Sequence, residues 1–180
     1  SFLMITADNG GDITSALSGV ATKDDFANVF IPKLSIAKNC GTASAKDTGC
    51  FPNARYRYLN GSYASAAWDN YSTCNWFSTI LTNDGMSYAF QGSSASCGTN
   101  LADPSTDTSN PLHDTCMQIH IDINGPNKGP SMIGRDMFFF WLTKKGLYPR
   151  GAYPSTVSSE CSTYGDGCAS QVLLDGAMDY

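Results

Sequence analysis

One loop between two strand-like segments constrains this chain more than any other feature. It runs from Asp122 through Pro130 to Asp136 and is rich in Gly, Pro and Asn. Residues 117–121 before it alternate between apolar and polar, and residues 137–142 after it form an apolar run of strand length. Gly and Asn adopt left-handed backbone angles at little cost, and Pro fixes its own φ. We predict two antiparallel strands joined by a structured polar loop that is too long for a tight hairpin turn.

Length and charge set the broad class. The chain has 180 residues, which suits one globular domain spanning 1–180, and only 15% of its residues are charged. Its net charge of −5 and the absence of a basic run argue against nucleic-acid binding. The sequence contains neither an apolar stretch long enough to span a membrane nor a signal peptide, and it does not begin with Met. We therefore expect a further N-terminal segment upstream of residue 1.

The cysteines indicate an oxidising compartment. There are seven, none forms a CxxC motif, and neither histidine lies near a Cys pair at zinc-finger spacing. Disulfides fit this pattern better than metal binding does. Other connectivities satisfy the same count, but three pairs that are near in sequence would each close a short loop and leave Cys74 over: Cys40–Cys50, Cys97–Cys116 and Cys161–Cys168.

Local patterns predict helices at the start of the chain. Residues 1–7 read as the end of a helix that Asn9-Gly10-Gly11 terminates. Thr22 with Asp25 resembles a capping box at the start of a second helix, which Pro32 must end or kink. We expect residues 1–38 to be helical and residues 39–83 to be a loop-rich mixed region.

Residues 84–180 are predicted to hold the sheet. Strands are expected at Met86–Phe90, Cys116–Ile123 and Asp136–Thr143, with the last of these in the centre because it is apolar on both faces. In the second strand, odd positions should face the core and the even positions Gln118, His120 and Asp122 should face solvent. The Cys161–Cys168 loop and an apolar tail, 172–174, follow. The predicted fold class is α+β, with an N-terminal helix packed on an antiparallel sheet of 3–5 strands.

Aromatic residues are concentrated between residues 51 and 77. They are Phe51, Tyr56, Tyr58, Tyr63, Trp68, Tyr71, Trp76 and Phe77. Aromatic side chains bury most of their area by default, so a second small core is the favoured interpretation. The alternative is a binding surface for a sugar or a partner subunit. Asn60 and Asn70 also match the N-glycosylation pattern, which matters only in a eukaryotic secretory pathway.

Calcium is the one cofactor that the sequence suggests. Asp122, Asn124 and Asp136, with loop carbonyls, could form an oxygen cage for this ion. An EF-hand is excluded because its twelfth position, which needs a bidentate acid, is Ile133. The competing interpretation is that these three side chains accept hydrogen bonds from the loop's own amides in Asx turns.

No catalytic motif stands out. His113 and His120 are the only histidines, Glu160 is the only glutamate, and no nucleophile elbow, zinc-protease motif or phosphate-binding glycine loop occurs. Cys74 and a histidine could form a thiol catalyst, but a cysteine left without a disulfide partner is much more often a spare one. We therefore expect a protein that is not an enzyme.

Several motifs, in order along the chain, resemble the type IV pilin-like proteins, which carry a prepilin-type N-terminal helix. The central stretch resembles the C-terminal half of these proteins. The other matching elements are Phe26–Phe30, Lys38-Asn39-Cys40, Gly49-Cys50-Phe51, Asp84-Gly85 before a strand, Cys168, and Asp175-Gly176 leading to Tyr180. Two departures are the absent N-terminal helix and Ala177, where a Trp is expected.

The resemblance implies a pilin head whose N-terminal helix has been truncated. It implies a structural subunit, anchored in the inner membrane before assembly, that polymerises through that helix into an extracellular filament for adhesion, motility or uptake. Its partners would be other pilin subunits and, on a surface, glycans. A pseudopilin of type II secretion is the alternative within this class, and a secreted glycan-binding module is the alternative outside it.

Overall fold

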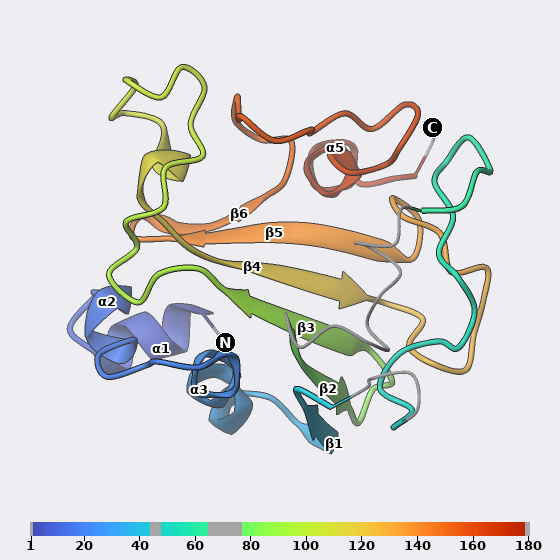
Figure 1. Ribbon diagram of the computed structural model, residues 1–180, viewed down its shortest axis with the longest axis horizontal. Coiled ribbons are helices and arrows are strands. Elements are labelled where there is room, and N and C mark those ends of the chain that lie inside the picture. The colour runs from blue at the N-terminus through green and yellow to red at the C-terminus, as the bar shows by residue number, and fades with distance from the viewer. Residues whose placement is uncertain (1, 44–47, 65–76, 179–180) are drawn as a thin grey trace.

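The computed structural model describes residues 2–43, 48–64 and 77–178, and in this part the chain is an α+β fold around one antiparallel sheet (Figure 1). Helices α1 (Phe2–Asp8), α2 (Ile13–Ala16) and α3 (Lys23–Phe30) come first. They gather near one end of strand β3, and α3 packs against β2 and β3. Helix α5 (Cys168–Asp175) packs against β5 and β6, near the other edge of the sheet.

The limits of α3 follow the local sequence signals. The side chain of Thr22 accepts a hydrogen bond from the amide of Asp25 at 3.2 Å, and the Asp25 carboxylate accepts one from the amide of Thr22 at 2.8 Å. This is the expected capping box, with acidic residues in the first turn of the helix. Pro32 ends the α-helix, and the chain continues as the 3₁₀ helix η1 (Ile31–Lys33).

The sheet has six strands in the described part of the chain, not the three to five expected. They are β1 (Ile36–Gly41), β2 (Ser78–Thr82), β3 (Ser87–Gly92), β4 (Thr115–Asp122), β5 (Met137–Thr143) and β6 (Gly146–Pro149). Each strand pairs with the next along the chain, in antiparallel fashion. The 3₁₀ helix η2 (Pro111–Asp114) leads directly into β4.

The three strands that sequence reasoning missed lack the alternating pattern it relied on. Strand β1 starts at Ile36, so the first 38 residues are not all helical. Its residues are mostly exposed and include a lysine, as suits an edge strand that must not attract another chain. Strand β2 has five residues, of which only the adjacent Ile80 and Leu81 are apolar, so it shows no period, and β6 follows the Lys144-Lys145 turn for only four residues. Strand β1 therefore depends on long-range pairing with β2, whereas β2 and β6 form by pairing across short turns with β3 and β5.

The two faces of the sheet are covered differently, and the expected assignment of the wet face was wrong. The even positions of β4, expected to face solvent, are buried: Gln118 is 6% exposed, and His120 and Asp122 are 0% exposed. Together with Phe139 and Met137 they form what we call the sealed face, over which Phe51, Tyr56 and Phe77 pack. The polar side chains lie inside because the loop-rich segment 49–64 folds back over them. This segment contacts the 131–133 stretch through backbone hydrogen bonds.

The opposite face, which we call the open face, carries Ile119 and Ile121 of β4 and Phe140 of β5. It holds the larger core at one end, where α1, α2 and α3 contribute Ile5, Ile13, Leu17 and Phe30. Coverage decreases along β4: Met117 is fully buried, Ile119 is 4% exposed, Ile121 is only partly buried, and Ile123 is 38% exposed. The apolar side of this strand is therefore its less protected side.

Three disulfides close the loops around the sheet. They join Cys40 to Cys50, Cys97 to Cys116 and Cys161 to Cys168, which are the pairs that near spacing favoured. The last of these ties the C-terminal loop to the first residue of α5, a helix that sequence reasoning had described only as an apolar tail. Gly176 ends α5 in a left-handed conformation, φ +69. Cys74, Trp68, Tyr71, Trp76, the Asn70 pattern and the terminal Tyr180 lie outside the described residues.

Candidate functional site

The loop between β4 and β5 is held in place by two aspartates at its ends. Asp122, the last residue of β4, accepts hydrogen bonds from the amides of Asn124 and Gly125, both at 2.9 Å. Asp136 accepts one from the amide of Met132 at 2.8 Å and one from the side-chain amide of Asn124 at 2.6 Å. The backbone closes the loop with a 2.9 Å bond from Ile123 N to Asp136 O.

The three residues proposed as calcium ligands are therefore brought together, but the contacts between them are those of the competing interpretation. Each carboxylate accepts hydrogen bonds from loop amides, and the Asn124 side chain donates to Asp136 rather than presenting its oxygen to a shared centre. A bound cation would have to replace several of these bonds. Within the described residues, no group of three or more His, Cys, Asp and Glu side chains is arranged to hold a metal ion. Calcium binding by this loop stays a prediction.

Burial changes the acidity of both aspartates. Desolvation raises the pKa of Asp122 to about 6, although its hydrogen bonds from the Tyr56 hydroxyl and from two loop amides favour the charged form. The pKa of Asp136 is also raised, again chiefly by desolvation, against the opposing effect of the Met132 amide. The site is thus a buried acidic pair that anchors the loop to the sealed face.

Close backbone approach explains two of the loop's glycines. Gly125 has φ +64, and a Cβ at this position would lie 1.9 Å from the carbonyl oxygen of Gly85 in the β2–β3 turn. Gly134 has φ +89, and a Cβ there would lie 2.9 Å from Cys168 Sγ. The loop is therefore pressed against a turn on one side and against the start of α5 on the other, where only glycine fits.

The aromatic-rich segment divides into buried and exposed members. Phe51, Tyr56 and Phe77 pack into the sealed face, as the interpretation of a second small core predicts. Tyr63 is the exception, with 51% of its surface exposed. Its ring lies against two arginines, with the guanidinium carbon of Arg57 4.0 Å and that of Arg55 4.7 Å from the ring centroid. This pairing of an exposed ring with cations is a candidate binding surface that the sequence indicated only through its tyrosine.

An apolar groove crosses the open face. It has a volume of about 140 Å³ and runs from the end of α3 over β3, β4 and β5 to β6. Its lining is apolar except for one tyrosine hydroxyl: Phe30, Leu34, Tyr88, Phe90, Ile119, Ile121, Phe140 and Leu147. Leu147 is 38% exposed, and Tyr88, Ile121 and Phe140 are partly buried. Phe140 also packs against the α5 cluster, so the groove continues from the α1–α3 core toward α5.

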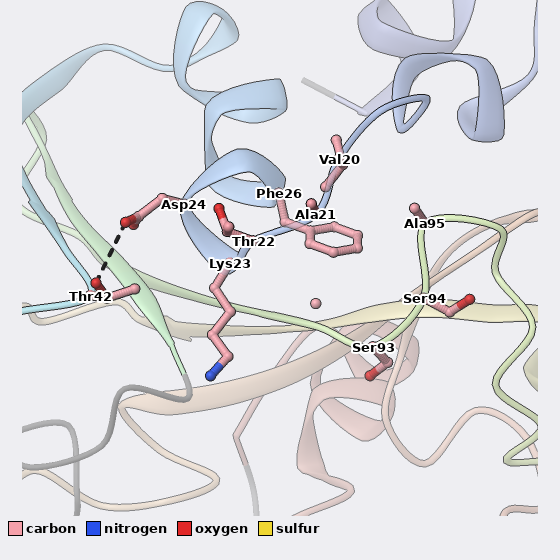
Figure 2. A pocket seen from close by; sticks show the side chains of 11 residues that line it. Val20, Ala21, Thr22, Lys23, Asp24, Phe26, Thr42, Ser93, Ser94 and Ala95 are labelled. Atoms are coloured by element: carbon pink, nitrogen blue, oxygen red, sulfur yellow. Dashed lines mark hydrogen bonds between the residues drawn. The ribbon is translucent and has the colours of Figure 1, made fainter.

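A wider hollow of about 530 Å³, whose lining mixes hydroxyl, charged and apolar side chains, opens where α3 begins (Figure 2). Thr22, Lys23 and Asp24 border it on the helix, and Ser93 and Ser94 border it on the chain leaving β3. Asp24 is held at its rim, accepting hydrogen bonds from Ser78 at 2.5 Å and from Thr42 at 3.5 Å. Hydroxyl groups and one short helix terminus leave this hollow without a marked chemical preference.

A buried ion pair, which sequence reasoning missed, fixes the C-terminal loop. Arg150 follows β6, and its Nη2 lies 3.5 Å from Asp166 Oδ2, with the two side chains 3% and 7% exposed. Arg150 also donates from Nε to the carbonyl of Ser158 at 2.7 Å and lies over the rings of Phe139 and Trp141. Burial lowers the pKa of Arg150 and raises that of Asp166. No sequence pattern distinguishes this arginine from an exposed one.

The two histidines lie in different surroundings. His120 lies on the sealed face between the rings of Phe77 and Phe139, with centroids 4.8 and 4.5 Å away. Desolvation, followed by the charge of Arg150, lowers its pKa well below the usual range, so it stays neutral at physiological pH. His113 is partly exposed beside Asp114, with 3.7 Å between Nδ1 and Oδ1. The Cys74 of the catalytic alternative lies outside the described residues.

No family model, curated protein or solved structure matches this chain. None of the helices in the described ranges has both the length and the apolar character needed to cross a bilayer.

Proposed function

We propose that this chain is the head domain of a structural, non-catalytic subunit of an extracellular filament of the type IV pilin kind. The observation that carries the proposal is the contrast between the sealed face and the groove on the open face. A half-buried apolar sheet face needs a covering layer, and a helix with an apolar stripe is the usual one. In this proposal a helix preceding residue 1 lies in the groove beside α3 and continues beyond the head into the filament.

The positions of the matching motifs support this reading. Cys40, at the end of β1, is bonded to Cys50, which closes the loop after the first strand. Asp84-Gly85 forms the turn before β3, and Cys168 begins α5. The motifs thus fall on turns, disulfides and element ends around one sheet, as they would in a compact head that is displayed on a filament.

The disulfides support the proposed location. Three of them close surface loops in a domain with few charged residues. Such bonds persist in the periplasm and outside the cell, where thiols are not kept reduced. A subunit that is anchored in the inner membrane by its proposed helix, oxidised on the periplasmic side and then assembled outward would pass through these compartments.

The full-length gene and a groove substitution test the proposal together. The gene should encode a prepilin-type processing site followed by about 20 apolar residues, and the protein should appear in surface filaments by immunogold electron microscopy. Ile121→Lys, within the groove, should abolish incorporation into filaments. Leu173→Lys is the matched control, because Leu173 is 64% exposed on α5 and does not line the groove.

Three outcomes would change the proposal. A cleaved signal peptide and a freely secreted protein would contradict it and favour the second candidate, a secreted glycan-binding module, for which the exposed Tyr63 and its two arginines are the supporting observation. A short periplasmic filament that depends on a type II secretion system would keep the structural role and assign the chain to the pseudopilins. Filaments that still incorporate the Ile121→Lys variant would show that the groove is not the surface on which the proposed helix lies.

A further inference from the structure

The surface around Tyr63 is built on a rigid hairpin. The amide of Tyr58 donates to Ser62 O and that of Ala64 to Tyr56 O, both at 2.9 Å, and the side chain of Asn60 accepts from the amide of Ser62 at 2.9 Å. The hairpin is fastened to the rest of the molecule at both ends. Arg57 exchanges backbone hydrogen bonds with the 131–133 stretch, and Asn60 N donates to Thr163 O at 3.0 Å. The backbone of this hairpin is therefore held in place by its own hydrogen bonds and by those to two neighbouring segments.

Tyr63 orients the guanidinium group of Arg57. Nη2 of Arg57 donates to the Tyr63 hydroxyl and Nη1 donates to the carbonyl of Gly61, both at 2.8 Å. Arg55 lies against the same ring and donates to the carbonyl of Ala64 at 3.0 Å. The acceptors that Arg57 uses are a carbonyl and a hydroxyl, which are neutral, so its positive charge is retained at the surface. A guanidinium has five donors in a fixed fork, and Arg57 uses two of them here.

A third arginine lies next to this hairpin. Arg57 bridges to Met132 in a parallel pairing, and the tight turn that follows, closed by Arg135 N to Met132 O at 3.2 Å, presents the exposed Arg135. In Figure 1 the segment containing Arg57 (cyan to green-blue) runs beside the β4–β5 loop. The hairpin carries Arg55 and Arg57, and the turn after its backbone bridge to Met132 carries Arg135, so three of the four arginines lie in these two paired segments of a protein whose net charge is −5.

We propose that this surface, defined by Arg55, Arg57, Tyr63 and Arg135, binds an acidic polysaccharide through its carboxylate or sulfate groups. Guanidinium forks match the two oxygens of such groups and bind them bidentately. Exposed amides and hydroxyls nearby, on Asn53, Asn60 and Ser62, suit the hydroxyl groups of a sugar chain. The Tyr63 ring already contacts two cations. A nucleic acid would need open aromatic faces for its bases and a more basic protein, so a sugar polymer fits better.

Because the protein carries a net charge of −5, its overall electrostatic interaction with a polyanion is repulsive, so retention on a polyanion must come from a local basic surface. The chain is applied at low ionic strength to immobilised heparin, which carries sulfate, and to polygalacturonate, which carries only carboxylate. Wild type should be retained on at least one of them and released by salt. Arg57→Gln and Arg135→Gln should each weaken binding by about fivefold, the upper range for one exposed charged contact.

Lys144→Gln is the matched control, because it changes the net charge equally at the opposite end of β5 and leaves the Arg57 hairpin untouched. Equal losses from Lys144→Gln and Arg57→Gln would overturn the proposal, as would absence of wild-type retention or tighter binding to a single-stranded oligonucleotide. Free sulfate that displaces the protein more strongly than chloride at equal ionic strength would assign the surface to small anions, against a polymer site.

Two further measurements distinguish a loss of polysaccharide binding from a loss of folding and from a loss of filament assembly. If Arg57→Gln fails to fold, judged by its melting curve, Arg135→Gln alone decides the matter because its side chain is exposed in a turn. The inference does not depend on the filament proposal. Arg57→Gln in the full-length protein should leave filament assembly unchanged while reducing polysaccharide binding, so that failure of one proposal can be told from failure of the other.

Discussion

The sealed and open faces of the sheet differ in a way that hydrophobicity alone does not predict. The sealed face carries Gln118, His120 and Asp122 and is almost inaccessible, whereas the open face carries Ile119, Ile121 and Ile123 and becomes more exposed along the strand. Burial here follows the loops that fold over the sheet. A polar side chain can lie inside when it finds hydrogen bonds there, as Asp122 does, and an apolar one can lie near the surface when a covering layer is absent.

The difference in coverage between the two faces bears on the proposed function. On the sealed face, burial is completed by the chain itself through the 49–64 segment. On the open face, the helices α1–α3 cover one end and α5 contacts Phe138 and Phe140, and the groove between them is apolar. The first face therefore serves stability, and the second is the face on which an additional helix would be accommodated in the proposed filament subunit.

The largest expected effect separates two adjacent phenylalanines of β5. Phe139 is 1% exposed on the sealed face, so Phe139→Ala should lower the free energy of unfolding by about 3–5 kcal/mol. Phe140 lies on the open face and is only partly buried, so Phe140→Ala should cost about 1–2 kcal/mol. Urea denaturation of both variants makes the comparison. Equal losses would mean that the two faces are equally packed in solution.

Removal of a disulfide compares the two cores. Cys97 and Cys116 pack with the open-face core, and Cys40 and Cys50 pack with the sealed-face core. Replacing either pair with serines should cost roughly 2–4 kcal/mol in the chain-entropy model. The Cys97–Cys116 loss should be the larger because its loop spans 19 residues against 10. Thermal unfolding measures this, after peptide mapping without reductant verifies the pairs. A different connectivity in that map would refute the framework.

The pH dependence of stability tests the buried carboxyl of the sealed face. Asp122 has a pKa of about 6 in the fold against 3.8 in the unfolded chain, so its neutral form is favoured by folding. Its contribution is therefore greatest below pH 3.8 and is lost as the pH rises through 6, by up to about 3 kcal/mol.

Asp122→Asn should remove this decline. The measurement is the difference in unfolding free energy between wild type and variant from pH 4 to pH 7. Several exposed aspartates with lowered pKa, such as Asp25 and Asp84, change stability with pH in the opposite direction, but they do so in both proteins and therefore cancel in the difference. Tyr56→Phe is the companion variant. It removes a hydrogen bond to the charged carboxylate and should raise the pKa of Asp122 further. A difference that does not vary with pH would show that Asp122 titrates normally.

The smallest effect is expected at the rim of the groove. Leu147 is 38% exposed on β6, so Leu147→Ala should change the unfolding free energy of the head by less than about 1 kcal/mol. Urea denaturation of the isolated head gives this value. A loss above 2 kcal/mol would indicate that the groove is closed in solution by the chain's own residues, and the contrast between the two faces would then be smaller than described.

Local signals in the sequence were sufficient where the interaction is local. The capping box of α3, its end at Pro32, the turn at Asp84-Gly85 and the strands flanking the central loop all depend on residues a few positions apart, so they could be predicted. The three disulfides also join cysteines that are near in sequence. Strand β1 could not be predicted because its partner is distant in the chain, with Ile36 paired to Thr82. Strands β2 and β6 pair locally, across the turns at Asp84-Gly85 and Lys144-Lys145, but they were missed because neither shows an alternating apolar pattern.

The candidate sites also divide into those that the sequence could indicate and those that only the fold brings together. The sequence placed Asp122, Asn124 and Asp136 in one loop but left open whether they hold a cation or bond to the loop's own amides, and the structure shows both carboxylates accepting hydrogen bonds from loop amides. It gave no sign of the Arg150–Asp166 pair, whose residues are brought together by the fold of the C-terminal loop, or of the contacts of Arg55 and Arg57 with Tyr63, which depend on the hairpin pairing. It reversed the wet and dry faces of β4, because a period of two tells which side chains share a face, and only the folding of segment 49–64 over the sheet decides which face is covered.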